Sequence, residues 1–449
     1  MMSLGQAASV LGASVRGADA RFGGVSTDTR TLRPADLFVA LRGERFDGHS
    51  FLQSAAAARA AAALVDRDYA GEPPLPVAVV ADTRLALGAL ARHWRARFQP
   101  VLIAVAGSNG KTTVKEMLAA ILRSHAGEDA VLATTGNLNN DIGVPLTLLR
   151  MRQAHRWCAI ELGMNHKGEI AYLADLARPT VALVNNAQRE HLEFMGSVDE
   201  VAAENAALYA ALPADGVAVV NADDDHAGFF RSRAGSRRIV DFGLQKATIG
   251  GECSLKPLSS EIAIRAPDGE AHASLAIPGL HNVRNALAAV ACAHAAGIDV
   301  KSIATGLTAF RPYSGRLQVK RSRSGATVID DSYNANPDSV RAAIDVLASC
   351  PGPTVLVLGD MGEVGAQGPE FHREVGAYAR AKGIASLLAL GEAAREAVQA
   401  FGPGARHFDR LEDLVANVSG KSILVKGSRF MRMERVVAAL TGTAAEGGH

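Results

Sequence analysis

The stretch from Val101 to Leu122, VLIAVAGSNGKTTVKEMLAAIL, changes character twice within a short span. It begins with a continuous apolar run, which is typical of a parallel strand buried on both faces. Gly107 and Gly110 then supply the backbone freedom that a tight turn needs. From Lys111 onward, apolar residues recur at helical spacing. The stretch therefore predicts a strand, a glycine loop and a helix that packs on a sheet.

A glycine loop between a buried strand and a helix predicts a polyphosphate site. Backbone N–H groups of the loop and of the helix N-terminus point at the anion, a lysine neutralises charge, and a threonine can hold Mg²⁺. Val105 stands where the GxxxxGK[ST] pattern has its first glycine, so this loop is a shortened variant. A mere turn with a surface lysine leaves the flanking strand and helix unexplained. The predicted ATP-binding residues of the loop are Gly107, Ser108, Asn109, Gly110, Lys111, Thr112 and Thr113.

Composition narrows the class of protein. The 449 residues suffice for about three domains of ordinary size. With 47 basic and 46 acidic residues the chain is near neutral, which argues against a nucleic-acid partner. The 4 cysteines are widely spaced, as expected for reduced thiols in the cytoplasm. We see no signal peptide and no apolar run near the ~20 residues of a membrane span. We therefore expect a cytoplasmic protein without a membrane span.

The pattern of apolar and polar residues predicts three domains and an α/β fold. Residues 1–98 predict a small α/β domain, in which Ser54–Leu64, SAAAARAAAAL, is expected to be helical. Residues 99–311 alternate strand and helix, which predicts a doubly wound, mainly parallel sheet around the phosphate loop. A hinge over Arg311–Arg316 leads into residues 312–449, a Rossmann-like α/β domain. That domain has no GxGxxG motif, so its fold carries no dinucleotide prediction.

Two side chains follow strands of the predicted central sheet. In open α/β sheets, ligands bind at the carboxyl ends of the strands. Glu161 ends the strand CAIEL, where a carboxylate can reach nucleotide-bound Mg²⁺, although an acid at a strand end can also be a cap. His191 follows the strand VALV by a short loop; a lone histidine is more often packed or exposed than a ligand. We therefore predict that Glu161 is a metal ligand. This reasoning alone leaves open whether His191 is a ligand.

Several motifs together resemble the Mur ligase family over essentially the whole chain. They are GSNGKTTVKEM, GNLNNDIGVPLTLL, ELGMNHKGEI, HNVRNALAA, DDSYNANPDS, LGDMGEVG and KGSR. The resemblance implies a three-domain amide ligase of peptidoglycan precursor synthesis that uses ATP and Mg²⁺. Within the family, it implies that D-Ala-D-Ala is joined to the tripeptide carboxylate of a UDP-linked precursor through an acyl phosphate. It also implies small-molecule substrates, and we expect a monomer.

The resemblance implies roles for particular residues. Lys111, Glu161 and His191 would be catalytic, and Mg²⁺ would lie on Thr112, Glu161 and His191. The further predicted ATP contacts are Asn282, Arg316 and Asp331. The predicted contacts to the UDP-linked substrate are Ser26, Thr27, Asp28, Arg30, Asn137, Asn139 and Asn140. The predicted D-Ala-D-Ala side comprises Asn334, Asn336, Asp360, Lys426, Ser428 and Arg429.

One position departs from the family pattern. Most Mur ligases carry a lysine, modified to a carbamate, on the helix after the metal histidine, and the count from HLEFMGS places Asn205 there. No lysine occurs between Lys167 and Lys246, so a shift of register cannot restore it. We therefore predict that the chain has no carbamylated lysine. Its anionic contact must come from Glu204 or from water, or be dispensed with.

Two other activities stay open at this point. The first is another amide ligase of the same superfamily, either the enzyme that adds the third amino acid or a folylpolyglutamate synthase. The third-amino-acid enzyme usually carries a DNPR-type signature, where this chain has DDSYNANPDS and KGSR. The second is a P-loop regulatory ATPase, a reading that leaves KGSR and the polar stretch VSTDTR without a role.

Overall fold

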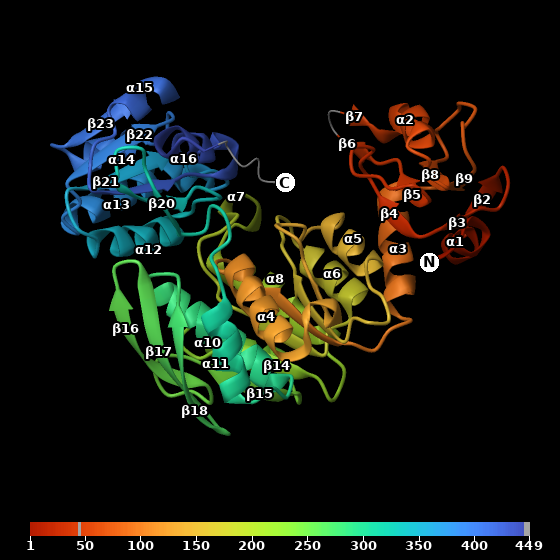
Figure 1. Ribbon diagram of the computed structural model, residues 1–449, viewed down its shortest axis with the longest axis horizontal. Coiled ribbons are helices and arrows are strands. Elements are labelled where there is room, and N and C mark those ends of the chain that lie inside the picture. The colour runs from red at the N-terminus through yellow and green to blue at the C-terminus, as the bar shows by residue number, and fades with distance from the viewer. Residues whose placement is uncertain (44–45, 444–449) are drawn as a thin grey trace.

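The computed structural model describes residues 1–43 and 46–443, which form three α/β parts, each with a large sheet of its own (Figure 1). The N-terminal part lies at one end of the longest axis and the C-terminal part lies toward the other, with the phosphate-loop sheet between them (Figure 1). The α/β prediction is confirmed. Residues 444–449 of the third predicted domain lie outside the described residues.

The N-terminal part is built on a five-stranded sheet of order β2-β9-β8-β5-β4. Its elements are β1 (Met2–Ser3), α1 (Leu4–Leu11), β2 (Ser14–Arg16), β3 (Arg21–Phe22), β4 (Gly24–Ser26), β5 (Asp36–Val39), β6 (Arg42–Gly43), β7 (Phe46–Asp47), α2 (Leu52–Ala57), β8 (Ala62–Asp66), β9 (Val77–Val80) and α3 (Thr83–Arg95). The helix predicted over Ser54–Leu64 is wrong beyond Ala57. Its last residues belong to β8, which is buried throughout and pairs with β5 and β9 on either side.

The central part contains the predicted doubly wound sheet, with six parallel strands in the order β11-β12-β10-β13-β14-β15. Its elements are β10 (Val101–Ala106), α4 (Lys111–Ala126), β11 (Val131–Ala133), α5 (Gly143–Leu149), β12 (Trp157–Glu161), α6 (Glu169–Ala177), β13 (Val181–Val184), α7 (Leu192–Met195), α8 (Val198–Ala206), β14 (Val217–Asn221), α9 (Ala227–Ala234), β15 (Arg238–Phe242), β16 (Gly250–Lys256), β17 (Ser259–Ala266), β18 (Gly269–Leu275), α10 (Leu280–Ala295) and α11 (Val300–Ala309). β16, β17 and β18 form a separate antiparallel sheet.

The C-terminal part has a six-stranded sheet of order β19-β20-β24-β21-β22-β23, in which only the β19–β20 pair is antiparallel. Its elements are β19 (Gln318–Arg321), β20 (Thr327–Asp331), α12 (Pro337–Ala348), β21 (Thr354–Gly359), α13 (Gly368–Ala381), β22 (Ser386–Leu390), α14 (Arg395–Phe401), β23 (Ala405–Phe408), α15 (Leu411–Ala416), β24 (Ser422–Lys426) and α16 (Glu434–Thr441). The Rossmann-like prediction therefore describes this part correctly.

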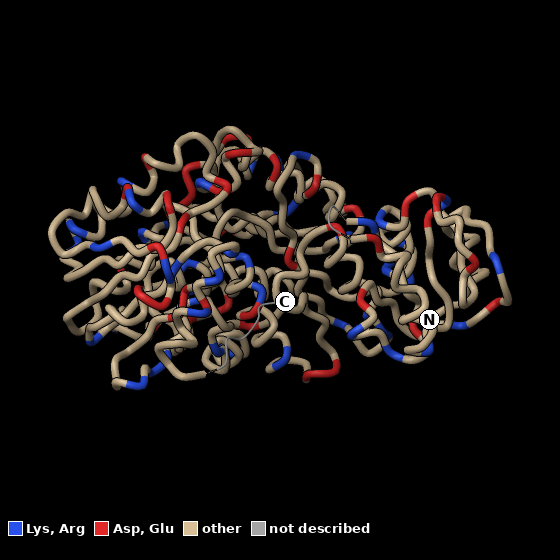
Figure 2. Tube along the Cα trace, turned by 90° about the horizontal axis from the view of Figure 1, so that it is seen from above, with Lys and Arg blue, Asp and Glu red and all other residues tan. Residues whose placement is uncertain are grey.

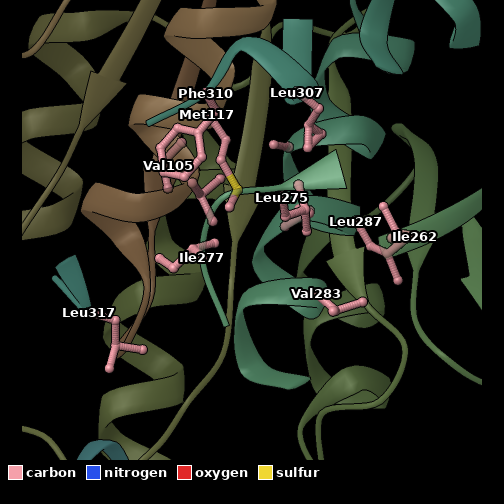
Figure 3. Close-up of a cluster of buried hydrophobic side chains, with 14 of the residues drawn as sticks. Val105, Met117, Ile262, Leu275, Ile277, Val283, Leu287, Leu307, Phe310 and Leu317 are labelled. Atoms are coloured by element: carbon pink, nitrogen blue, oxygen red, sulfur yellow. The ribbon is translucent and has the colours of Figure 1, made fainter. Parts of the chain in front are cut away.

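The helix that follows the phosphate loop rests on an apolar core. Val105 on β10 and Met117 on α4 are fully buried and lie beside Phe310 and Ile277 (Figure 3). The same cluster contains Leu317, beyond the predicted hinge, so it joins the central part to the segment entering the third (Figure 3). Truncation of a buried methionine or leucine to alanine lowers the free energy of unfolding by about 2–5 kcal/mol. Packing of this strength holds α4 firmly in place. The phosphate loop is thus carried by two fixed elements, β10 and α4.

Helix α3 connects the first part to the second by packing as well as by sequence. The indole Nε1 of Trp94 donates a hydrogen bond to the carbonyl oxygen of Met151 at 3.0 Å. Nε of Arg95 donates to the carbonyl oxygen of Ala177 at 2.9 Å. Ala177 ends α6 and Met151 lies two residues beyond α5, so α3 is fastened to the central part although it precedes residue 98.

Charged residues of both signs are interspersed over the whole trace (Figure 2). This mixture agrees with the formal net charge of +1. In the described part of the chain, no helix combines the length and apolar character that crossing a membrane requires. The cysteines, Cys158, Cys253, Cys292 and Cys350, are all free thiols, as the sequence predicted.

Candidate active site

A cavity of about 840 Å³ lies where the phosphate loop, the ends of the central strands and the C-terminal part meet. The predicted residues that line it are Ser108, Asn109, Gly110, Lys111, Thr112, Thr113, Asn137, Asn139, Asn140, Glu161, His191, Asn282, Arg316, Asp331, Asn334, Asn336, Lys426, Ser428 and Arg429. The predicted residues outside its lining are Gly107, Asp360, Ser26, Thr27, Asp28 and Arg30. Most of the predicted residues therefore line one cavity, and they come from the central and C-terminal parts of the molecule.

The phosphate loop has the geometry of an anion cradle. Gly107 and Gly110 have φ angles of 123° and 82°, which side-chain-bearing residues rarely adopt. A Cβ on Gly110 would also collide with the side chain of Asn285. Lys111 begins α4, and its Nζ donates to the carbonyl oxygens of Gly107 at 2.7 Å and Ser108 at 2.9 Å. The ammonium is thus held over the loop, where a phosphate chain would lie.

Thr112 and Glu161 fit a Mg²⁺ ion. Oγ1 of Thr112 donates to Oε1 of Glu161 at 3.1 Å, and Nδ2 of Asn139 donates to the same oxygen at 2.8 Å. The other carboxylate oxygen, Oε2, is buried and has no hydrogen-bond partner among the described residues. Leaving a buried carboxylate oxygen unpaired is costly, and Mg²⁺ prefers oxygen ligands. Because no three His, Cys, Asp or Glu side chains within the described residues form a closed metal site, phosphate and water would complete the coordination.

His191 bridges the central and C-terminal parts. Its Nδ1 lies 2.6 Å from Oε2 of Glu363, and its Nε2 lies 3.6 Å from Oε1 of Glu190. The contact with His191 lowers the pKa of the Glu363 carboxyl, against the opposing effect of burial. Both His191 and Glu363 have left-handed backbones, with φ of 52° and 60°. Such strain persists only where the surroundings impose it, and it is concentrated at functional sites.

Residues 186–191, which we call the bridging loop, contact both the phosphate loop and the C-terminal part. The even positions bind the phosphate loop. Oδ1 of Asn186 accepts from the backbone N–H of Asn109 at 2.8 Å, and Oε1 of Gln188 accepts from the side chain of Asn109 at 2.7 Å. Both oxygens of Glu190 lie 3.2 Å from Nζ of Lys111. The loop is therefore tied to the residues that would meet the nucleotide.

Two odd positions of the bridging loop, Arg189 and His191, bind the C-terminal part, whereas the backbone N–H of Ala187 donates to Asp224 of the central part at 3.0 Å. The guanidinium of Arg189 donates to Asp338 through Nε and Nη2, at 3.1 and 2.6 Å, and to Glu374 through Nη1 at 2.7 Å. The two carboxylates raise the pKa of Arg189. His191 contacts Glu363, as described above. Sequence reasoning missed Arg189 and Glu190, because their roles follow from contacts between segments far apart in the chain.

Asn205, which the resemblance places at the position of the modified lysine, is buried in the central part. Its Oδ1 accepts from the backbone N–H of Gly107 at 2.8 Å, and its Nδ2 donates to the carbonyl oxygen of Val201 at 3.0 Å. Glu204, one of the alternatives for the anionic contact, is engaged elsewhere. Its two oxygens accept from the backbone N–H groups of Gly168 and Ile170, both at 2.8 Å, and cap the start of α6.

The C-terminal residues divide differently from their predicted grouping. Asn336 was placed on the D-Ala-D-Ala side, but its Nδ2 donates to Oδ1 of Asn109 in the phosphate loop at 2.9 Å. Asp360 does not reach the cavity, since its Oδ1 accepts from the backbone N–H of Ala394 at 2.8 Å. The assignment of Asp360 to the substrate site is therefore corrected, because it bonds the backbone of the third part instead. Asn336 lines the cavity beside the phosphate loop, and its contact with D-Ala-D-Ala stays a prediction.

Around β20 and β24 the predicted polar residues form one network. Nζ of Lys426 lies 2.5 Å from Oδ2 of Asp331, whose Oδ1 accepts from the backbone N–H of Leu317 at 3.2 Å. Nη2 of Arg316 donates to Oγ1 of Thr112 at 3.2 Å, and its guanidinium lies over the ring of Tyr333, 4.1 Å from the centroid. The segment entering the third part is thus hydrogen-bonded to the predicted metal-binding threonine.

The remaining predicted residues have local partners. Nδ2 of Asn282 donates to the carbonyl oxygen of Pro278 at 2.7 Å, which ties this side chain to the start of α10. Oγ of Ser428 donates to the carbonyl oxygen of Ala335 at 3.1 Å. Arg429 pairs with Glu434 at 3.2 Å. In the N-terminal part, Ser26, Thr27, Asp28 and Arg30 form a turn in which Asp28 pairs with Arg30 at 2.5 Å.

Comparison with known families covers the chain in consecutive ranges. Residues 21–95 match the model described as Mur ligase family, catalytic domain. Residues 105–293 match the Mur ligase middle domain. Residues 315–429 match the model described as Mur ligase, glutamate ligase domain.

Individual relatives span nearly the whole chain. The UDP-N-acetylmuramoyl-tripeptide–D-alanyl-D-alanine ligase of Escherichia coli (strain K12) is 42% identical over 448 residues, covering 98% of both chains. The crystal structure of MurF from Acinetobacter baumannii has a TM-score of 0.90 at 35% identity, again covering 98% of both chains. The crystal structure of MurF ligase from Thermotoga maritima in complex with ADP has a TM-score of 0.80 at 26% identity, and covers 94% of this chain and 97% of that chain.

Proposed function

We propose that this chain, which belongs to the Mur ligase family, joins D-alanyl-D-alanine to UDP-N-acetylmuramoyl-tripeptide with conversion of ATP to ADP and phosphate. The family resemblance inferred from the motifs is confirmed by the family models and by the full-length relatives. The observation that carries the proposal is the 42% identity to an enzyme of that name over 98% of both chains. The cavity adds chemical support, because it combines a phosphate loop with a buried carboxylate.

The reaction must activate a carboxylate, because a carboxylate is a poor electrophile. One oxygen of the tripeptide carboxylate attacks the γ-phosphorus of ATP, the bond to ADP breaks, and an acyl phosphate results. The amine of D-Ala-D-Ala then attacks the acyl carbon, and phosphate leaves from the tetrahedral intermediate with the proton that the nitrogen gives up. Lys111 and the loop N–H groups stabilise the charge that develops on the β- and γ-phosphates.

The residues of this chain would hold Mg²⁺ on the hydroxyl of Thr112 and the unpaired Oε2 of Glu161, with His191 serving a second cation. When bound, the metal supplies positive charge that polarises the phosphoryl oxygens. Asn139 and Thr112 orient the Glu161 carboxylate through its other oxygen, so that Oε2 stays turned toward the ligand. Exclusion of water by the segments that meet at the cavity would protect the acyl phosphate from hydrolysis.

We assign the substrates to the three predicted domains. Residues 1–98 take the UDP end of the precursor, residues 99–311 bind ATP, and residues 312–449 contribute to the nucleotide and amine sites. The ADP complex of the Thermotoga maritima relative supports use of an adenine nucleotide by this chain. We further propose that the protein acts as a cytoplasmic monomer, since its substrates are small molecules.

The proposal is tested by following product and phosphate together. The protein is incubated with ATP, Mg²⁺ and UDP-N-acetylmuramoyl-tripeptide, with and without D-Ala-D-Ala. We expect phosphate release to depend on the dipeptide, and mass spectrometry to show one pentapeptide product formed for each phosphate. Release that depends on glutamate or a free diamino acid would indicate another amide ligase. Hydrolysis stimulated by a protein partner without any amide product would indicate a regulatory ATPase.

A further inference from the structure

Glu190 lies between the phosphate loop and the predicted metal histidine. Its side chain is 11% exposed, and both carboxylate oxygens lie 3.2 Å from Nζ of Lys111. Oε1 of the same carboxylate lies 3.6 Å from Nε2 of His191. All three side chains line the cavity. Glu190 therefore lies beside both the lysine that would meet the phosphates and the histidine that would meet a cation.

Helix α8 of this chain lacks the negative charge that the modified lysine brings to the metal site in most family members. The position that holds the carbamylated lysine in most family members is occupied by Asn205, which is neutral and whose two polar atoms are both engaged. The neighbouring Glu204 is engaged in capping α6 and does not line the cavity. Helix α8 therefore supplies no negative charge to the cavity from either residue.

We propose that Glu190 supplies this charge, as a ligand of the same divalent cation as His191 when nucleotide is bound. The inference rests on the proposed ATP- and Mg²⁺-dependent function. Neighbouring ligands of an octahedral Mg²⁺ lie about 3 Å apart, because each bond is about 2.1 Å long. The 3.6 Å between Oε1 of Glu190 and Nε2 of His191 needs only a small adjustment to reach that spacing.

Lys111 explains why Glu190 is kept in place and how it becomes available. In the structure, the carboxylate neutralises the ammonium of Lys111. The γ-phosphate of ATP competes for the same ammonium, and once it binds, Glu190 loses its partner. A largely buried carboxylate without a partner is unstable, so a cation beside His191 becomes the favoured neighbour. The exchange couples nucleotide binding to completion of the metal site.

The orientation of His191 supports this assignment. Its Nδ1 faces the carboxylate of Glu363 on the C-terminal part at 2.6 Å, which leaves Nε2 facing Glu190. A carboxylate behind a histidine is the usual arrangement that orients a metal-binding ring. The second cation would thus have one ligand pair from the bridging loop, and phosphate, the acceptor carboxylate and water would provide the rest.

The test is a Mn²⁺ titration of the full chain in the presence of a non-hydrolysable ATP analogue, followed by electron paramagnetic resonance. We compare the wild type with Glu190→Gln and with Glu200→Gln, which makes the same change on an exposed side chain of α8. Glu190→Gln should weaken the second Mn²⁺ site about 10- to 100-fold and leave the first unchanged. Glu190→Asp keeps the charge, so its affinity for the second Mn²⁺ should lie between those of the wild type and Glu190→Gln. Glu200→Gln should have the affinity of the wild type.

Each other outcome contradicts the inference in a recognisable way. Unchanged Mn²⁺ affinity in Glu190→Gln, with tighter nucleotide binding in EDTA, would mean that Glu190 only neutralises Lys111. Equal weakening by Glu200→Gln would mean that the overall charge of the protein is responsible. If the wild type binds the nucleotide analogue but no Mn²⁺, the proposed metal-dependent function fails together with the inference. Thermal melting of each variant confirms that the compared proteins are folded.

Discussion

Replacement of Lys111 by alanine is expected to lower the rate of acyl-phosphate formation on the order of 1,000-fold, while binding of the UDP-linked precursor is unchanged. The ammonium lies over the phosphate loop, within 2.9 Å of two of its carbonyl oxygens. Removal of one preorganised charge donor from a phosphoryl-transfer site typically costs about that much. The rate is measured as ADP release in a single turnover, and precursor binding is measured by calorimetry.

The control for this variant is Lys167→Ala, which removes a lysine whose side chain is 57% exposed and pairs with Glu200. It should retain wild-type turnover. Lys111→Ala also leaves the buried carboxylate of Glu190 without its partner. The double variant Lys111→Ala/Glu190→Gln removes that unpaired charge, so it shows the effect of losing the phosphate contact alone. If Lys111→Ala loses precursor binding together with phosphate transfer, and the double variant does not recover the binding, the loop organises the fold instead.

Replacement of Arg189 by alanine is expected to lower kcat/KM on the order of 100-fold, which corresponds to about 2.7 kcal/mol. Its guanidinium bonds two carboxylates of the C-terminal part, and each charge-assisted hydrogen bond contributes about 1.5–3 kcal/mol. The loss leaves Asp338 and Glu374 without this shared cation at the junction of two parts. Steady-state kinetics give the effect, and small-angle scattering reports whether the C-terminal part moves away.

The matched control is Arg341→Ala. Arg341 also binds Glu374, at 2.9 Å, but both residues belong to the C-terminal part. Its removal should change kcat/KM only a few-fold and leave the scattering profile as it was. If the two variants behave alike, the contact across the parts has no special effect and the account of the bridging loop is wrong.

The contact between Arg189 and Glu374 predicts that the junction of the two parts responds to acid. The hydrogen bond from Arg189 is the largest of the effects that lower the pKa of Glu374. A carboxyl whose pKa is lower in the folded arrangement stabilises it above the ordinary pKa, and that stabilisation is lost as the pH falls through the lowered value. The junction should therefore be unaffected near neutral pH and open only in acid. In Arg189→Ala, scattering should lose this dependence.

Local patterns were sufficient for the phosphate loop but not for the alanine-rich segment after Ser54. The strand, glycine turn and helix around Lys111 follow from short-range periodicity and from φ angles that glycine permits. By contrast, Ala62–Asp66 lies between two strands and is buried throughout, so sheet pairing overrides the helical preference of alanine. Tertiary contacts decided that element.

In the candidate site, too, local patterns predicted some features and contacts between distant segments decided others. The place of Glu161 in the cavity was predictable because Glu161 ends a parallel strand, and strand ends gather at one edge of a sheet. The contact of Asn336 with Asn109 could not be predicted, because it joins residues of two different parts. Arg189 and Glu190 lie in no motif, and only the folded chain shows that they face opposite partners.

The most direct test of the central claim labels both oxygens of the tripeptide carboxylate with ¹⁸O. If the carboxylate attacks ATP to form an acyl phosphate, one ¹⁸O is transferred to the released phosphate and the other stays in the new amide. We therefore predict phosphate that carries one ¹⁸O atom, in amounts equal to the pentapeptide product and only when D-Ala-D-Ala is present. Phosphate whose new oxygen comes from solvent water, with both ¹⁸O atoms left in the tripeptide, would contradict the account.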